Sequence, residues 1–383
     1  MKLTADRLRA MTLARQFPSI RGRGEAQLLE LFRRLGPIQS QVPRAPFLTA
    51  ASRLPGIGYQ TINNAFSQHR LVKTTNLRGT VHTTVVEQFA AVDAARRRQN
   101  AKDLGRTLHL DVGGVADLID DLETFCADEW KRRDTLLDHV RRQLEARHRP
   151  ASFPELDRTY ERNLVWGHSG LIRRPKDDHW ESRTDAYHRT ARRVVPEIGV
   201  VDHDAAILEL TRVHLGAYGP ASRRDVAWWL GVPLGTADRA IAALEPELVN
   251  HTGPDGTELL DLAAIPAQHS ADPGLRLLPE YDGLLLGYQG RNRDRFLAHD
   301  QLEGIWARSN GLFSPAVLFR GRIVGSWRSR GPKSSTVVEI TPFDVSTRIT
   351  DDDLAPALDA TVGALELVIS DVRVLPATDT VES

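Results

Sequence analysis

Two glutamines near the start of the chain, Gln39 and Gln41, form a candidate site because their amides lie two residues apart between prolines. Pro37 and Pro43 fix their own φ and bias the preceding residues away from helix, so we expect a strand or polyproline-like segment. Side chains two apart on an extended chain point the same way. Both amides would then face one spot, each offering one acceptor oxygen and two donor hydrogens.

The composition is that of an ordinary soluble globular protein. The chain has 383 residues, of which 41% are hydrophobic and 26% charged, enough for two to four domains. Its single cysteine, Cys126, excludes an internal disulfide framework and a multi-cysteine metal site. No apolar run approaches the roughly 18 residues needed to span a membrane, and the first residues lack a signal-peptide core. We therefore expect a cytoplasmic protein.

Charge is distributed unevenly along a chain whose net charge is zero. Residues 1–110 contain 18 Lys and Arg against 6 Asp and Glu, an excess of +12, so the remaining 273 residues carry 32 against 44, or −12. Such asymmetry indicates a basic face directed at a polyanion. The alternative is a set of solvated arginines without a partner.

The first 86 residues predict three helices followed by a hairpin. A helical stripe over 25–35 ends at Gly36-Pro37, and further helices fit 47–54 and 58–69. Residues 71–85 are β-branched and interrupted by Gly79, which is typical of a hairpin. Three helices and a hairpin make a winged helix.

The pattern returns twice. Residues 87–147 are helical by periodicity and lead through 152–156 and 163–166 to a second wing, 170–175 and onward to 179–181. The third copy has helices over 207–218, 222–230 and 236–244, a turn at 231–234 and a strand at 258–262. Asp238, Glu245 and Glu247 lie in or just after the last of these helices, the one that would read DNA, so we favour a scaffold over a DNA reader.

From residue 275 the chain is rich in short strands, which indicates a small β-barrel or sandwich. The expected strands cover 277–279, 284–288, 316–319, 323–327 and 336–340. Asn310-Gly311 is a strong hairpin signal. An amphipathic helix at 354–368 and a loose tail from Pro376 complete the chain.

Three features together resemble the winged-helix DNA glycosylases of the AlkZ and YcaQ type. They are the Gln-x-Gln motif, the wing Arg78-Gly79-Thr80-Val81-His82, and a C-terminal signature that reads RLLPEYDGLLLGY over 276–288 and RGRIVGSWR over 320–328. The ordered set spans nearly the whole chain. Gln41 places the chain with the AlkZ-like branch, since the other branch has aspartate there. Ser40 departs from the family, where the middle residue is usually apolar.

The resemblance implies an α+β, C-shaped DNA clamp of three tandem winged-helix units and a C-terminal small β-barrel. The expected units are 1–86, with the Gln-x-Gln motif, 87–200, 201–270, and 271–383 with the last helix. Such proteins excise bulky alkylated purines from double-stranded DNA, and several protect antibiotic producers from their own alkylating products. The resemblance thus implies a monomeric, monofunctional glycosylase that needs no cofactor or metal, with Gln39 and Gln41 as its catalytic pair.

Two amides suffice for this reaction only if the substrate already carries a good leaving group. Glutamine does not titrate near neutral pH, so neither residue is a true general base. Alkylation at N7 of guanine or N3 of adenine leaves a cationic base that departs readily, giving an oxocarbenium-like sugar. The amides would position a water and stabilise positive charge. Because guanine N7 faces the major groove, we expect an open channel rather than a closed base pocket.

Several residues are expected to touch DNA. Basic residues that surround the motif in sequence are candidates for phosphate contacts: Arg44, Arg53, Arg70, Lys73 and Arg78. His82 is placed near the lesion by the resemblance, the alternative being a structural histidine. The hairpin at Asn310, with Leu312 and Phe313, either inserts apolar side chains between base pairs or is an ordinary barrel hairpin.

Other sites are not supported by spacing. Two histidines and three aspartates match no metal-ligand pattern: His179, His188, Asp177, Asp178 and Asp185. Residues 21–24 lack the lysine, strand and helix of a phosphate loop, and Cys126 is expected to be a buried thiol. The serious alternative function is a winged-helix transcriptional regulator that binds operator DNA without catalysis.

Overall fold

The N-terminal part begins the motif on a strand at the edge of a small sheet, with Gln39 on the strand and Gln41 just after it. The computed structural model describes residues 1–108, 110–147, 165–182, 185–266, 272–307 and 311–377. The first elements are α1 (Ala5–Gln16), α2 (Glu25–Leu35), β1 (Ile38–Gln39), α3 (Ala45–Arg53), α4 (Tyr59–Ser67), β2 (Leu71–Thr75), η1 (Leu77–Gly79), β3 (Val81–Val85) and η2 (Val86–Gln88). The strand order is β1-β3-β2, all antiparallel.

The predicted helices and hairpin of this part are confirmed to within a few residues. Gly36, at φ 73°, ends α2 as expected, and Pro37 prevents its continuation. The turn between β2 and β3 contains Arg78 at φ 55° and Gly79 at φ 71°. The sequence did not predict α1, because its polar and apolar residues do not segregate clearly to two faces, although Thr4 caps it by accepting from the Arg7 backbone N–H.

The second part is helical with a three-stranded sheet of order β4-β6-β5. Its elements are α5 (Phe89–Leu108), α6 (Val112–Phe125), β4 (Lys131–Arg132), α7 (Arg133–Arg147), β5 (Leu171–Pro175), β6 (Asp185–Thr190) and α9 (Ala191–Val194). The expected strand at 179–181 is wrong, since β5 pairs with β6 instead. Trp180 is buried and stacks on Phe66 at 5.0 Å, so this loop packs on α4. Residues 152–156 lie outside the described chain.

The third part follows the predicted order of helices and strands closely. It comprises α10 (His203–Tyr218), α11 (Arg223–Leu230), α12 (Leu234–Leu244), η4 (Glu245–Glu247), β7 (Leu248–Thr252) and β8 (Glu258–Leu262). Ser222 and Asp225 form a capping box at the start of α11, and Gly231 ends it in the left-handed conformation. Whether the three helix-and-hairpin segments are winged helices stays a prediction.

The C-terminal part is an open sheet where a small barrel was expected. Its elements are β9 (Arg276–Leu277), α13 (Gly283–Leu286), η5 (Gly290–Arg295), η6 (Asp300–Gly304), β10 (Trp306–Ala307), β11 (Leu312–Phe313), β12 (Ala316–Phe319), β13 (Arg322–Arg330), β14 (Thr336–Pro342), α14 (Asp351–Leu365) and β15 (Ile369–Val374). The five-stranded sheet has the order β15-β14-β13-β12-β9. Within the described residues its edge strands do not pair with each other, so the sheet does not close.

One predicted strand of this part is a helix. Residues 284–288 were expected to extend, but Asp282 accepts the backbone N–H of Leu284 and starts α13. A short apolar run cannot be assigned to strand or helix by periodicity alone, and here the cap decides.

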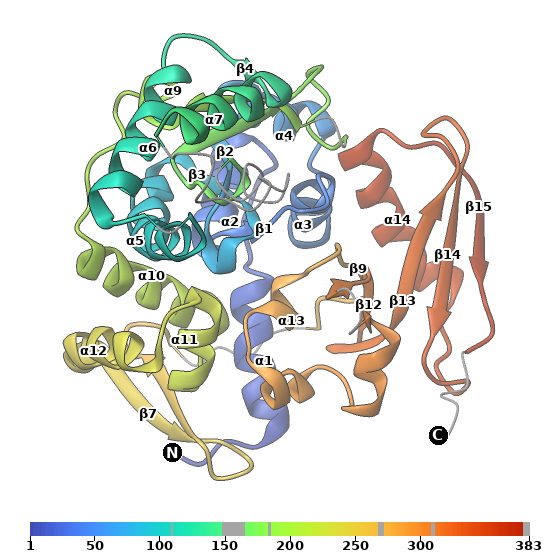
Figure 1. Ribbon diagram of the computed structural model, residues 1–383. Helices are drawn as coiled ribbons and strands as arrows, with labels where there is room; N and C mark the ends of the chain where they lie inside the picture. The colour runs from blue at the N-terminus through green and yellow to red at the C-terminus, as the bar shows by residue number, and fades with distance from the viewer. Residues whose placement is uncertain (109, 148–164, 183–184, 267–271, 308–310, 378–383) are drawn as a thin grey trace.

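Two large cores tie distant parts of the chain together. One joins α2, α3 and α4 to the C-terminal sheet and α14, which lies between α3 and the sheet in Figure 1. The other joins α5, α10 and α11 to α13, η6 and β12. Both cores therefore cross the expected boundaries at 86, 200 and 270, and the four-unit division remains a prediction. No helix of the described residues is long and apolar enough to span a membrane.

Candidate functional site

Gln39 and Ser40 of the Gln-x-Gln motif are held extended by backbone pairing with β3. Gln39 lies opposite His82, and the backbone N–H of Ser40 donates to the Val81 carbonyl at 2.7 Å. Because this pairing keeps the chain extended, the side chains alternate as expected.

The two amides meet, but in different environments. Nε2 of Gln39 donates to Oε1 of Gln41 at 2.7 Å. Gln39 is only 8% exposed, whereas Gln41 is exposed. The outer amide is therefore the one that can contact another molecule directly, while the inner amide orients it.

Ser40 points to the other side and is fully satisfied. Its hydroxyl is buried and lies 2.8 Å from both the Ile38 carbonyl and Oγ1 of Thr83. A polar residue is thus accommodated at the middle position because Thr83 on β3 supplies a matching hydroxyl. Its presence does not disturb the alternation that brings the glutamines together.

Arg78 connects the inner glutamine to α11. Its Nη2 donates to Oε1 of Gln39 at 3.0 Å, and its Nη1 donates to the Trp229 carbonyl at 2.8 Å. The guanidinium also lies over the Trp228 ring, 4.8 Å from the centroid. Burial lowers the pKa of Arg78 to about 10, so it stays cationic at neutral pH. Its donors are thus used inside the protein.

His82 lies beside the site as a buried neutral histidine. Its Nδ1–H donates to the Thr80 carbonyl at 2.9 Å, since a carbonyl can only accept. Burial, assisted by the nearby Arg78 charge, lowers the pKa of His82 to about 3. His82 therefore carries no charge at neutral pH and cannot act there as a cationic DNA contact.

The cavity next to Gln39 is too small for a base. Its volume is about 20 Å³, enough for roughly one water molecule. Besides Gln39 and His82, its polar lining includes Arg53 and Asp282, which form an ion pair at 2.8 Å with both side chains 1% exposed. A purine cannot enter this space.

Three of the predicted phosphate contacts are engaged within the protein. Arg44 pairs with Glu280 at 2.6 Å, Arg53 with Asp282 at 2.8 Å, and the buried Lys73 with Asp185 at 2.9 Å. These ion pairs give the three cations a structural role within the protein, and their predicted contacts with DNA stay a prediction. Together with Arg78, these residues tie the first 80 residues to the rest of the chain.

Arg70 has the exposure that a phosphate contact requires. Its side chain is 48% exposed, and its nearest carboxylates, Glu25 and Glu87, lie at the long distances of 4.0 and 3.9 Å. Such loose surface pairs contribute little and break easily. Among the basic residues predicted to contact phosphates, Arg70 therefore fits that role by its exposure.

The predicted inserting hairpin is partly packed away. Phe313 is 6% exposed and stacks on Trp306 at 5.5 Å, and Arg293 lies over both rings. Leu312 is 47% exposed, so of the two apolar candidates it is the one that faces outward. Asn310 lies outside the described residues.

The sequence did not predict that residues of α11 and η5 contact the guanidinium of Arg78 or the ring on which it lies. The guanidinium of Arg293 lies 5.0 Å from the centroid of the Trp228 ring, and the guanidinium of Arg78 lies over the same ring. The pairing of Arg53 with Asp282 was missed as well. The sequence signals were the adjacent tryptophans of the third copy and an aspartate inside the C-terminal signature, but neither indicates a partner so far away in the chain.

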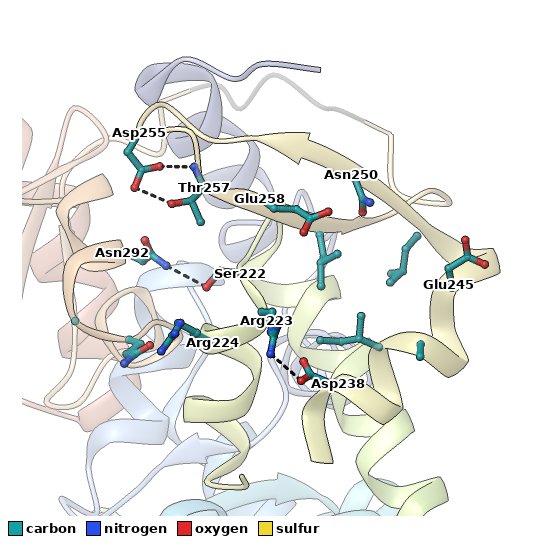
Figure 2. A pocket seen from close by; sticks show the side chains of 16 residues that line it. Ser222, Arg223, Arg224, Asp238, Glu245, Asn250, Asp255, Thr257, Glu258 and Asn292 are labelled. Atoms are coloured by element: carbon teal, nitrogen blue, oxygen red, sulfur yellow. Dashed lines mark hydrogen bonds and ion pairs between the residues drawn. The ribbon is translucent and has the colours of Figure 1, made fainter. Parts of the chain in front are cut away.

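A large hollow of the described residues lies away from the motif. A cavity of about 1010 Å³ opens between α11, α12 and the β7–β8 hairpin (Figure 2). Its charged lining has two arginines, Arg223 and Arg224, against four carboxylates: Asp238, Glu245, Asp255 and Glu258. Arg223 is paired with Asp238, and Asp255 accepts from Thr257. This excess of negative charge disfavours binding of DNA phosphates.

Other candidates are dispersed in the structure. His179 contacts Tyr59, Asp185 pairs with Lys73, and His188 is buried on β6. Across the described ranges, no group of three or more His, Cys, Asp or Glu side chains is arranged to hold a metal ion. Cys126 is buried as predicted, and desolvation raises its pKa to about 12, which makes the thiol unreactive.

Comparisons with known proteins agree on one family. The family model described as DNA glycosylase AlkZ-like matches residues 32–367. A curated protein of Streptomyces sahachiroi, named interstrand DNA cross-link repair glycosylase, is 28% identical over 159 residues, which are 38% of this chain and 39% of that protein. The solved structure of the Streptomyces sahachiroi DNA glycosylase AlkZ superimposes with a TM-score of 0.79 at 20% identity, covering 98% of this chain and all of that one. This structural likeness shows a shared fold.

Proposed function

The chain belongs to the AlkZ-like DNA glycosylase family, and from this premise we propose that it hydrolyses the N-glycosidic bond of bulky cationic alkylpurines in duplex DNA. The substrates would be N7-alkylguanine and N3-alkyladenine adducts. The observation that carries the proposal is the amide pair, in which the buried Gln39 donates to the exposed Gln41.

The arrangement of the two amides supports different roles for them, with Gln41 contacting the reacting atoms and Gln39 orienting Gln41. Gln41 reaches the sugar and the attacking water, because it is exposed and its Oε1 keeps a second lone pair free for them. Gln39 holds Gln41 in place. A preoriented amide dipole stabilises the developing positive charge without reorganising, and the cationic base leaves without needing an acid.

The size of the adjoining cavity supports an exposed lesion. A space of about 20 Å³ beside Gln39 excludes a flipped purine. The damaged nucleotide would therefore react at the surface of the protein, where a bulky adduct meets no wall. The relative is named for interstrand cross-link repair, and an exposed lesion is what a cross-linked base would require. We extend the proposal to such substrates and to self-resistance against a DNA-alkylating product.

The reaction would stop at the abasic site. A lyase step requires an amine that forms a Schiff base with the sugar, and Lys73 of the β2–β3 hairpin is buried and paired with Asp185. The protein would act as a monomer on DNA in the cytoplasm, with the basic N-terminal part toward the phosphates and with Arg70 and Leu312 among its contacts.

Base release is the decisive measurement. Duplexes that carry one N7-methylguanine or one bulky N7 adduct are incubated with the protein, and free base and abasic sites are measured. Wild-type protein is expected to release the base and to leave the strand intact until alkali is added. A double variant, Gln39→Ala with Gln41→Ala, should lose at least about 100-fold in rate while keeping its affinity for DNA.

A matched control removes two amides elsewhere. Gln143→Ala with Gln301→Ala, on α7 and η6, should release base at the wild-type rate. Undiminished activity of the Gln39/Gln41 double variant would refute the mechanism. A sequence-specific footprint without base release from either duplex would favour the transcriptional regulator instead.

A further inference from the structure

Arg78 holds the inner glutamine in one of two possible amide orientations. A guanidinium can only donate hydrogen bonds. The atom of Gln39 that faces Nη2 of Arg78, 3.0 Å away, must therefore be the carbonyl oxygen. Turning the amide over would bring its NH₂ group against the guanidinium donors.

The amide orientation of Gln39 in turn fixes the amide orientation of Gln41. With its oxygen on Arg78, Gln39 presents its NH₂ to Gln41, and the 2.7 Å contact makes Oε1 of Gln41 the acceptor. The chain of donors runs from Arg78 through Gln39 to Gln41. Each side-chain amide has two nearly equal orientations, so without Arg78 nothing in this chain of contacts selects one of them.

Arg78 is itself fixed from three sides. Its backbone lies in the left-handed region at φ 55°, its Nη1 donates to the Trp229 carbonyl, and its guanidinium lies over the Trp228 ring. Gly231 leaves room for it, since a Cβ there would lie 3.1 Å from the backbone N and from Cγ of Arg78. Helix α11 thus supports the motif although it lies about 190 residues away in sequence.

We propose that Arg78 is a positioning residue that sets the amide orientation of Gln39, and through it that of Gln41, with Trp228 and Trp229 holding the guanidinium in place. The proposal deepens the glycosylase function and rests on it for its catalytic consequence. The orientation itself is a property of the free protein. It also assigns Arg78 a role different from the phosphate contact that the sequence suggested.

The catalytic consequence is tested by single-turnover kinetics with Arg78→Met on a duplex from which the wild type releases base. The rate of base release should fall about 100-fold, as a small misplacement of a catalytic group can cause, while the Kd for DNA changes less than about threefold. Arg320→Met is the matched control, because Arg320 also has a positive φ, 51°, and lies over an aromatic ring, Phe319. It should behave as wild type.

A double-mutant comparison separates positioning from an independent role. If Arg78 acts through Gln39, then adding Arg78→Met to Gln39→Ala should cost less than about threefold more in rate. An undiminished rate of Arg78→Met, or fully additive losses in the double variant, would overturn the proposal. A loss confined to Kd, with a weaker salt dependence, would also overturn it in favour of a phosphate contact.

A second readout does not depend on activity. In protein labelled with ¹⁵N-glutamine, the side-chain NH₂ signals of Gln39 and Gln41 are assigned from their alanine variants. Arg78→Met should shift both signals and speed their hydrogen exchange, whereas Arg320→Met should not. Unchanged signals would overturn the proposal even if the enzyme is active. Changed signals in a protein that releases no base would leave the orientation standing and refute only the proposed reaction.

Discussion

At the scale of single residues, burial gives different roles to two identical side chains. Gln39 is 8% exposed and bonded on both ends of its amide, to Arg78 and to Gln41. Gln41 is exposed and bonded by its oxygen to Gln39. Spacing alone predicts that the amides meet, but it does not tell which is inner. Ser40 shows the same limit, since its tolerance depends on Thr83, 43 positions away.

The buried histidine beside the motif predicts how stability depends on pH. The pKa of His82 is lowered to about 3, whereas in the unfolded chain it has its ordinary value of about 6.5. Between these values the unfolded state binds a proton that the folded state does not. The free energy of unfolding therefore falls as pH decreases from about 6.5, by about 1.4 kcal/mol per pH unit for this group.

Urea unfolding of the wild type and His82→Gln at pH 7, 6 and 5 measures this contribution. The wild type should lose stability more steeply than the variant by that amount. Comparing slopes removes any constant difference that the substitution causes. Parallel curves for the two proteins would contradict a neutral, buried His82.

At the scale of elements, the site depends on contacts between segments that are distant in sequence. The strand β1 has two residues and is extended only because β3 pairs with it. Helix α3 is fixed to the start of α13 by Arg53 and Asp282, both 1% exposed. Asp282 also caps α13, so one carboxylate serves a helix end and an ion pair.

Breaking this ion pair should be costly. Arg53→Met leaves the Asp282 carboxylate buried without a cation, and we expect a loss of about 3–5 kcal/mol in the free energy of unfolding. Asp282→Asn in the same protein removes the charge and keeps a capping side chain, so it should restore much of the loss. Both values come from urea unfolding.

An exposed pair provides the comparison. Arg212 and Glu247 lie 2.7 Å apart with 43% and 48% of their side chains exposed. Arg212→Met should cost less than about 1 kcal/mol, because solvent screens the pair. Equal losses in the free energy of unfolding for Arg53→Met and Arg212→Met would show that burial does not strengthen the pair of Arg53 and Asp282.

These contacts also explain which predictions from sequence succeed. The helices at 25–35 and 222–230 have local end signals, Gly36 and Ser222, and they are where the sequence places them. Arg44, Arg53 and Lys73 pair with carboxylates 236, 229 and 112 positions away, and their neighbourhood in the sequence does not reveal these partners. The packing of Phe313 against Trp306 and Arg293 was likewise not predicted.

At the scale of the whole molecule, opposite charges occupy different regions. The first 110 residues carry an excess of +12 and the remainder −12. Four carboxylates line the hollow between α12 and the β7–β8 hairpin, while Arg70 is exposed between α4 and β2. A polyanion would therefore approach the N-terminal part, and the acidic remainder would keep it from binding elsewhere.

The salt dependence of DNA binding tests this polarity. Each phosphate contact releases counterions, so removing one should lower the slope of log K against log salt by about 1. We expect this of Arg70→Gln, with equal weakening for duplexes of different sequence. Arg373→Gln removes an exposed arginine from β15 in the acidic part of the chain and should leave the slope unchanged. An unchanged slope for Arg70→Gln, or an equal decrease for both variants, would show that DNA does not select the N-terminal face.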